Sequence, residues 1–60
     1  MLVLSRETGE RIIINPDTPD EIVICYLGIR SSAGRIGIIA PSEVVVMREE
    51  LLSRPRRKEA

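Results

Sequence analysis

Residues 35–50 read RIGIIAPSEVVVMREE, and this stretch decides the fold because two apolar segments and the start of a helix meet in it. Residues 44–47, Val-Val-Val-Met, are apolar and mostly β-branched, which predicts a strand covered on both faces. The chain then becomes charged at Arg48, Glu49 and Glu50. Acidic residues suit the first turn of a helix, whose free N–H groups favour negative charge, and Pro55 ends such a helix. We therefore predict a strand that gives way to a short helix at Arg48.

The chain has 60 residues, enough for one small domain that is only marginally stable on its own. It has one cysteine and no histidine, so an internal disulfide is excluded and a zinc site would lack its commonest ligands. Oligomerisation is the remaining means of stabilisation. The apolar residues form continuous runs, which need cover on both faces that one short chain cannot supply. We therefore predict an intertwined homodimer in which strands are shared between subunits.

Turn-forming residues divide the chain into five predicted strands and one helix, so the fold class is mainly β. Turns are expected at Thr8-Gly9-Glu10, within residues 15–20 and 31–34, and at Ala40-Pro41-Ser42. The predicted strands cover residues 1–7, 10–15, 21–30, 34–40 and 43–47, and a helix of about two turns follows. Residues 1–54 form the expected domain, and residues 55–60 form a flexible basic tail.

The missing residue types exclude several functions. Without histidine there is no common general base and no Ser-His-Asp triad, and no phosphate-binding glycine loop is present, so we expect no enzyme activity and no cofactor or metal. Cys25 is interpreted as a small core residue of a strand rather than a nucleophile. Gly28 and Gly37 are interpreted as marks of a bulge or strand crossing rather than of a ligand site. No signal peptide or membrane span is evident, so a cytoplasmic protein is expected.

The formal net charge is zero, but it is unevenly distributed. Residues 1–53 contain five arginines and eight acidic residues, a net of −3, and residues 54–60 contain four basic residues and one acidic residue, a net of +3. A slightly acidic body is a poor general binder of polyanions. Any nucleic acid would therefore have to be recognised through a few well-placed arginines.

Two arginines have the same sequence setting. Arg6 ends the first predicted strand and shares a face with Leu4, and Arg48 ends the last predicted strand and shares a face with Val46. Each places an aliphatic platform beside a cation. The alternative is that both arginines are ordinary surface charges that pair with nearby glutamates, namely Glu7, Glu10, Glu49 or Glu50.

The chain resembles the carbon storage regulator family, CsrA/RsmA, in an ordered set of motifs from Met1 to about Arg54. The matching segments are MLVLSR at 1–6, Gly9-Glu10, RIG at 35–37, Ala40-Pro41 and EVVVMREE at 43–50. The resemblance implies an interleaved homodimer of five-stranded chains, each followed by a short helix. It also implies binding to GGA motifs in mRNA leaders and repression of translation by blocking ribosome access. Further implied partners are sequestering small RNAs and a FliW-like inhibitory protein.

By the same resemblance, the RNA site lies between the first strand of one subunit and the last strand of its partner, which gives two sites per dimer. The implied RNA-binding residues are Leu4, Ser5 and Arg6 from one chain and Ala40, Pro41, Val44, Val46 and Arg48 from the other. Unpaired backbone groups at strand edges suit the edges of unstacked guanines, and aliphatic side chains suit their faces.

Three residues depart from the family pattern. Glu7 and Ser42 stand where basic residues are common among relatives, and Met47 stands where histidine is common. Each lowers positive charge or hydrogen-bonding capacity near the implied site. An alternative function is therefore a protein-interaction module of the same fold, bound mainly by a FliW-like regulator and binding RNA weakly.

Overall fold

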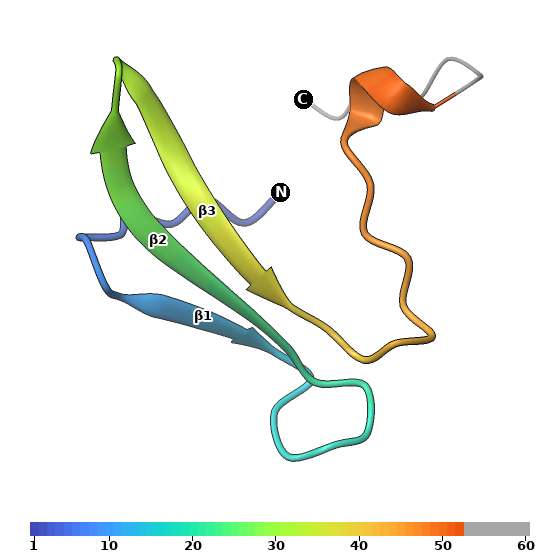
Figure 1. Ribbon diagram of the computed structural model, residues 1–60. Helices are drawn as coiled ribbons and strands as arrows, with labels where there is room; N and C mark the ends of the chain where they lie inside the picture. The colour runs from blue at the N-terminus through green and yellow to red at the C-terminus, as the bar shows by residue number, and fades with distance from the viewer. Residues whose placement is uncertain (53–60) are drawn as a thin grey trace.

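The structure is a computed structural model of the chain, and it describes residues 1–52. Three strands form one antiparallel sheet in the order β1-β2-β3 (Figure 1). They are β1 (Arg11–Ile14), β2 (Ile22–Arg30) and β3 (Ala33–Ile39), and a single 3-10 turn, η1 (Glu49–Leu51), follows. The three middle strands predicted from the sequence are therefore confirmed, and each boundary differs from the prediction by at most one residue.

Both connections between the strands contain residues with a left-handed backbone conformation. Asn15 and Asp17 have φ of 52° and 61° in the loop that joins β1 to β2. Asn and Asp tolerate this left-handed region better than most residues do. Ser31 and Ser32, with φ of 53° and 67°, form the two-residue turn between β2 and β3. Positive φ at both positions matches the right-handed twist of the two strands that the turn joins.

A bulge interrupts the pairing of β2 with β3. Tyr26 pairs with Ile36, but the next pair joins Gly28 to Arg35, so Leu27 is the extra residue. Gly28 has a φ of 97°, a conformation that glycine adopts without steric cost. The sequence interpretation of this glycine as a bulge position is confirmed.

The register places different residue types on the two faces of the sheet. Ile12, Ile24 and Ile38 lie side by side across the three strands, and Tyr26 and Ile36 continue this entirely apolar face. Because successive side chains alternate, the opposite face carries a second set of residues. These are Ile13, Val23 and Ile39 in one row and Arg11, Cys25 and Gly37 in the next.

One chain does not bury a core. Gly28 is the only buried residue among residues 1–52, and no hydrophobic side chain in this part of the chain is buried. Ile36 is 63% exposed and Ile39 is 65% exposed, although both belong to the sheet. The aliphatic runs that predicted two-sided cover are thus present in the single chain without that cover.

The two outer strands and the helix are corrected by the structure. Residues 1–7 and 43–47 do not form strands in the single chain, because neither segment has a neighbouring backbone with which to pair. Residues 49–51 form one 3-10 turn, and no α-helix occurs within residues 1–52. The predicted basic tail, residues 55–60, lies outside the described residues. No helix in the described part of the chain is long and apolar enough to cross a membrane.

Candidate functional site

The amino-terminal candidate residues are held near the start of β1 by the arginine side chain. Arg6 donates a hydrogen bond from Nε to the Ser5 carbonyl oxygen at 2.8 Å and from Nη1 to the Arg11 carbonyl oxygen at 3.2 Å. Its Nη2 lies 3.6 Å from Oε1 of Glu10, which also accepts a hydrogen bond from the Glu7 N–H at 2.7 Å. Leu4 remains 50% exposed. The arginine is therefore oriented by the backbone, and an apolar side chain lies nearby in sequence.

The carboxyl-terminal candidate residues lie beyond β3. Ala40 and Pro41 are half-buried where the chain leaves the sheet, and the N–H of Val44 donates to the Pro41 carbonyl oxygen at 3.0 Å. This turn sends the following segment away from the sheet (Figure 1). Val46 on that segment is 53% exposed.

Arg48 marks the junction between this segment and η1. Its backbone is extended, with φ of −66° and ψ of 137°, and the 3-10 turn starts at the next residue. The turn thus begins where the helix was predicted to begin, but neither the predicted strand before Arg48 nor an α-helix after it is present within residues 1–52. The Arg48 side chain is 78% exposed and forms an ion pair with Glu50. Both candidate arginines thus pair with glutamates in the single chain, and the pairs are solvent-exposed and weak.

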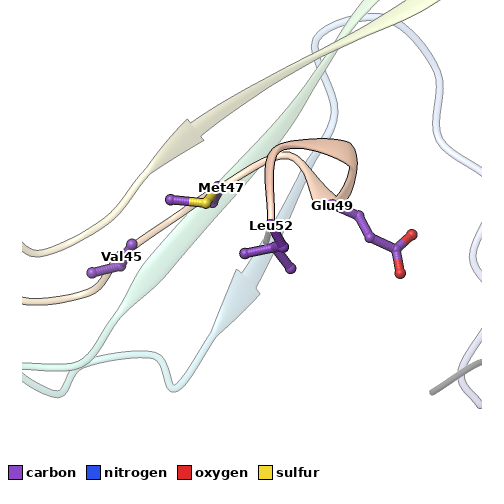
Figure 2. Close-up of a pocket in the computed structure, with 4 residues that line it drawn as sticks. All are labelled: Val45, Met47, Glu49 and Leu52. Carbon is purple, nitrogen blue, oxygen red and sulfur yellow. The ribbon is translucent and has the colours of Figure 1, made fainter. Parts of the chain in front are cut away.

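The segment that leads from β3 to η1 also borders a hollow on the surface. A hollow of about 380 Å³ is lined, among the described residues, by Val45, Met47, Glu49 and Leu52. Figure 2 shows the apolar side chains of Val45, Met47 and Leu52 on one side of the segment, with the Glu49 carboxylate directed away from them. Val45, Met47 and Glu49 alternate along the chain with Val44, Val46 and Arg48. If this segment formed a strand, those three lining residues and Arg48 would project to opposite sides.

One chain does not bring the two candidate groups together. Among the hydrogen bonds and ion pairs of residues 1–52, none joins Leu4, Ser5 or Arg6 to the residues from Ala40 to Arg48. In Figure 1 the segment after β3 runs apart from the sheet. Within the single chain the two candidate groups therefore remain on separate segments.

The structure also shows features that the sequence interpretation missed. Thr8 lies against the bulge at Gly28, and Leu52 lines the apolar hollow. Neither was predicted, because the first joins residues distant in sequence and the second depends on the path of the chain from Val45 to Leu52. No group of three or more metal-ligating side chains is assembled within residues 1–52.

These features define the class of the protein: a small, mainly β chain whose candidate site is made of exposed segments that carry aliphatic side chains and arginines. The family is established by comparison, since the model of the CsrA global regulator protein family matches residues 1–57. The chain belongs to this family. This family is described as one of global regulator proteins.

Individual relatives agree with this assignment. The chain is 46% identical over 52 residues to the translational regulator CsrA of Hydrogenovibrio crunogenus, covering 87% of this chain and 69% of that protein. It is 49% identical over 51 residues to the proteins of the same name from Thermotoga maritima and Thermotoga petrophila, covering 85% of this chain. The match spans 57% of the length of each Thermotoga protein. No solved structure matches the chain significantly.

Proposed function

We propose that the protein is an mRNA-binding regulator that recognises GGA motifs in mRNA leaders as an intertwined homodimer and represses translation by blocking ribosome access. The observation that carries this proposal is that the two outer segments of the chain are not paired with any strand. Residues 1–7 and 44–48 have no strand partner in the single chain, yet they carry both candidate arginines and a series of exposed aliphatic side chains.

The homodimer gives these segments a partner. If residues 1–7 of one subunit pair with residues 44–48 of the other, unpaired backbone groups of both segments are satisfied. The same arrangement covers the apolar face of the sheet that Ile12, Ile24 and Ile38 form, which one chain leaves uncovered. Two copies of the pairing then create two equivalent sites.

Each site combines three kinds of contact with RNA. Leu4 and Val46 supply apolar platforms for unstacked bases, and the neighbouring strand edges supply backbone donors and acceptors for guanine edges. Ser5, Ala40, Pro41 and Val44 shape the surface between them. Arg6 and Arg48 supply cationic contacts to the RNA, each released from its glutamate at small cost because both ion pairs are exposed.

The proposal includes the partners and the place of action that the family implies. The targets are mRNA leaders with GGA motifs, and small RNAs with several such motifs would compete for the same sites. The protein would act in the cytoplasm, where these RNAs meet the ribosome. The basic residues after Arg54 would add attraction that does not depend on sequence.

The test is a comparison of two hairpin RNAs that differ only in the loop, one with GGA and the other with CCA. We expect strong preference for the GGA hairpin, measured by anisotropy of a labelled RNA at fixed salt. Equal and weak binding to both RNAs would reject the proposal. It would favour instead the module bound by a FliW-like regulator, with Glu7, Ser42 and Met47 as the residues that weaken RNA binding.

A further inference from the structure

Three arginines of the sheet share one face. Arg11 pairs with Cys25, which pairs with Gly37, so these residues project to the same side. Arg35 precedes Gly37 by two residues on β3 and therefore projects to that side as well. Beyond the bulge, Arg35 pairs with Gly28 and Arg30 pairs with Ala33, which extends the set by one more arginine. We call Arg11, Arg30 and Arg35 the sheet arginines.

The residues around Arg35 leave its side chain accessible. Its neighbours on the same face are Gly28 across the strand pair and Ala33 and Gly37 along its own strand. The Thr8 side chain lies over Gly28 and the Leu27 side chain lies against Gly37, but Arg35 itself stays exposed. All three sheet arginines are exposed. No acidic side chain within residues 1–52 forms an ion pair with any of them. They are therefore available cations on a surface that the sequence interpretation did not single out.

The sheet arginines adjoin the amino-terminal part of the candidate site. Arg6 donates from its Nη1 to the backbone carbonyl of Arg11, which ties the first candidate arginine to the first sheet arginine. Thr8 lies over Gly28, and Gly28 pairs with Arg35. The segment from Arg6 to Thr8 thus meets the sheet beside the arginine-bearing face.

Charge is polarised along the sheet. The region near the β2–β3 turn and the start of β1 contains four arginines (6, 11, 30 and 35) and two glutamates (7 and 10), which gives a net charge of +2. The loop between β1 and β2, at the opposite end of the sheet, carries Asp17, Asp20 and Glu21 and no basic residue, a net of −3 (Figure 1). The overall negative charge of the body therefore conceals a positive end.

We propose that Arg11, Arg30 and Arg35 bind the phosphates of nucleotides that flank the recognised motif and so continue the RNA site from Arg6 onto the arginine-bearing face of the sheet. This inference rests on the proposed function. The guanidinium group suits phosphate because it donates two parallel hydrogen bonds to it. Continuity with Arg6 favours RNA over an acidic protein as the occupant. Such contacts add affinity and carry no sequence information.

The spacing of these arginines fits an extended strand of RNA. Arg11 and Arg35 lie on the two outer strands and are offset by two residues, so their Cα atoms are roughly 12 Å apart by standard sheet geometry. Long, flexible arginine side chains at this separation can contact different phosphates of one strand. They cannot all contact a ligand as small as the GGA triplet while Arg6 and Arg48 bind it as well.

The test uses the full chain, the variants Arg35→Gln and Arg30→Gln/Arg35→Gln, and two RNAs. One RNA is the GGA hairpin with its stem, and the other is a single-stranded hexamer centred on GGA. We expect the double variant to bind the hairpin at least fivefold more weakly and the hexamer unchanged. We also expect the preference for GGA over CCA in the hairpin to stay the same. The slope of log K against log salt should fall by about 1.4 to 1.8 in the double variant, because each lost phosphate contact contributes about 0.7 on a single strand and about 0.9 on a duplex.

Asn15→Asp is the matched control for Arg35→Gln. It lowers the net charge by the same one unit at the opposite end of the sheet, and aspartate tolerates the left-handed backbone of this position. We expect it to bind the hairpin like the original chain. If it weakens binding as much as Arg35→Gln does, the loss of affinity comes from the change in net charge and not from lost contacts between the sheet arginines and phosphates. The inference is then wrong.

The two proposals fail in different ways. Suppose that the original chain prefers GGA and that the double variant binds each RNA as tightly as the original chain does. Phosphate binding by the sheet arginines is then refuted, while the proposed function stands. This outcome would assign the sheet arginines to an acidic protein surface instead. If the original chain shows no preference for GGA, the proposed function itself fails. Circular dichroism spectra and melting temperatures of the variants should match those of the original chain, because the substituted residues are exposed.

Discussion

The side chain of Thr8 lies over the backbone of Gly28, with Oγ1 only 3.1 Å from the point that a Cβ atom at Gly28 would occupy. Gly9 donates its N–H to the Tyr26 carbonyl oxygen at 2.8 Å, and Tyr26 donates to the Glu10 carbonyl oxygen at 3.1 Å. The turn that follows the amino-terminal segment is therefore fixed on the bulge of β2. Through this contact, the bulge determines where Arg6 lies relative to the sheet.

Gly28→Ala should destabilise the protein by about 1–3 kcal/mol, because a Cβ at a φ of 97° is strained and would also press on Thr8. Gly34→Ala is the matched control. Gly34 has no positive φ, and its added Cβ would only reach ordinary contact distance, 3.5 Å, from the Tyr26 ring. Urea denaturation followed by circular dichroism measures both. Equal effects of the two substitutions would show that the bulge conformation is not the cause.

The middle of the fold follows from local sequence signals. Aliphatic runs bounded by turn residues predicted β1, β2 and β3, and the glycine at position 28 predicted the bulge. The outer strands were not found in the single chain, because a strand exists only where another backbone pairs with it. Val44-Val45-Val46 has strong strand propensity, but propensity supplies no partner. A single 3-10 turn begins at Glu49, where the charge pattern predicted a helix, and it ends at Leu51, since Leu52 has an extended backbone.

The candidate site, like the fold, was predictable from the sequence only in part. Sequence spacing singled out Arg6 and Arg48 as candidates. Their pairing with Glu10 and Glu50 matches the alternative that treats them as ordinary surface charges. Spacing alone does not reveal that Arg11, Arg30 and Arg35 share a face, because the bulge changes which residues of β2 and β3 are paired. That these arginines share a face can be deduced only once the pairing register of β2 with β3 is known.

The melting temperature should rise with protein concentration. One chain buries no hydrophobic side chain within residues 1–52, so folding and association should be coupled. Differential scanning calorimetry from about 5 to about 500 μM, beside sedimentation equilibrium, measures this. A monomer in sedimentation with a melting temperature independent of concentration would contradict the homodimer.

Arg48→Ala should weaken binding of the GGA hairpin at least tenfold and leave the folded assembly intact. The side chain is 78% exposed, so its removal creates no cavity, whereas a charged contact to RNA contributes more than 1 kcal/mol. RNA anisotropy measures the affinity, and the melting temperature reports the fold. Wild-type affinity in this variant would refute the proposed position of the site.

Glu50→Gln is the counterpart of that substitution. It removes the ion-pair partner of Arg48 while keeping the size of the side chain. Because an exposed ion pair is worth at most about 1 kcal/mol, freeing the arginine should strengthen RNA binding by no more than about fivefold. A loss of affinity would instead show that the pair orients Arg48 for binding.

Salt should weaken specific RNA binding less steeply than it does for a broadly basic protein. Residues 1–53 carry a net charge of −3, and only a few arginines of the candidate site and the sheet can neutralise phosphates. Deleting residues 55–60 removes two arginines and a lysine, and it should lower the affinity for GGA and CCA hairpins by the same factor. Titrations of both RNAs from 50 to 300 mM salt, roughly the range over which such slopes are resolved, compare the full chain with the shortened one. If the preference for GGA disappeared with these six residues, recognition would belong to the basic tail, and the pairing of Leu4 and Arg6 with Val46 and Arg48 would have to be abandoned as the site.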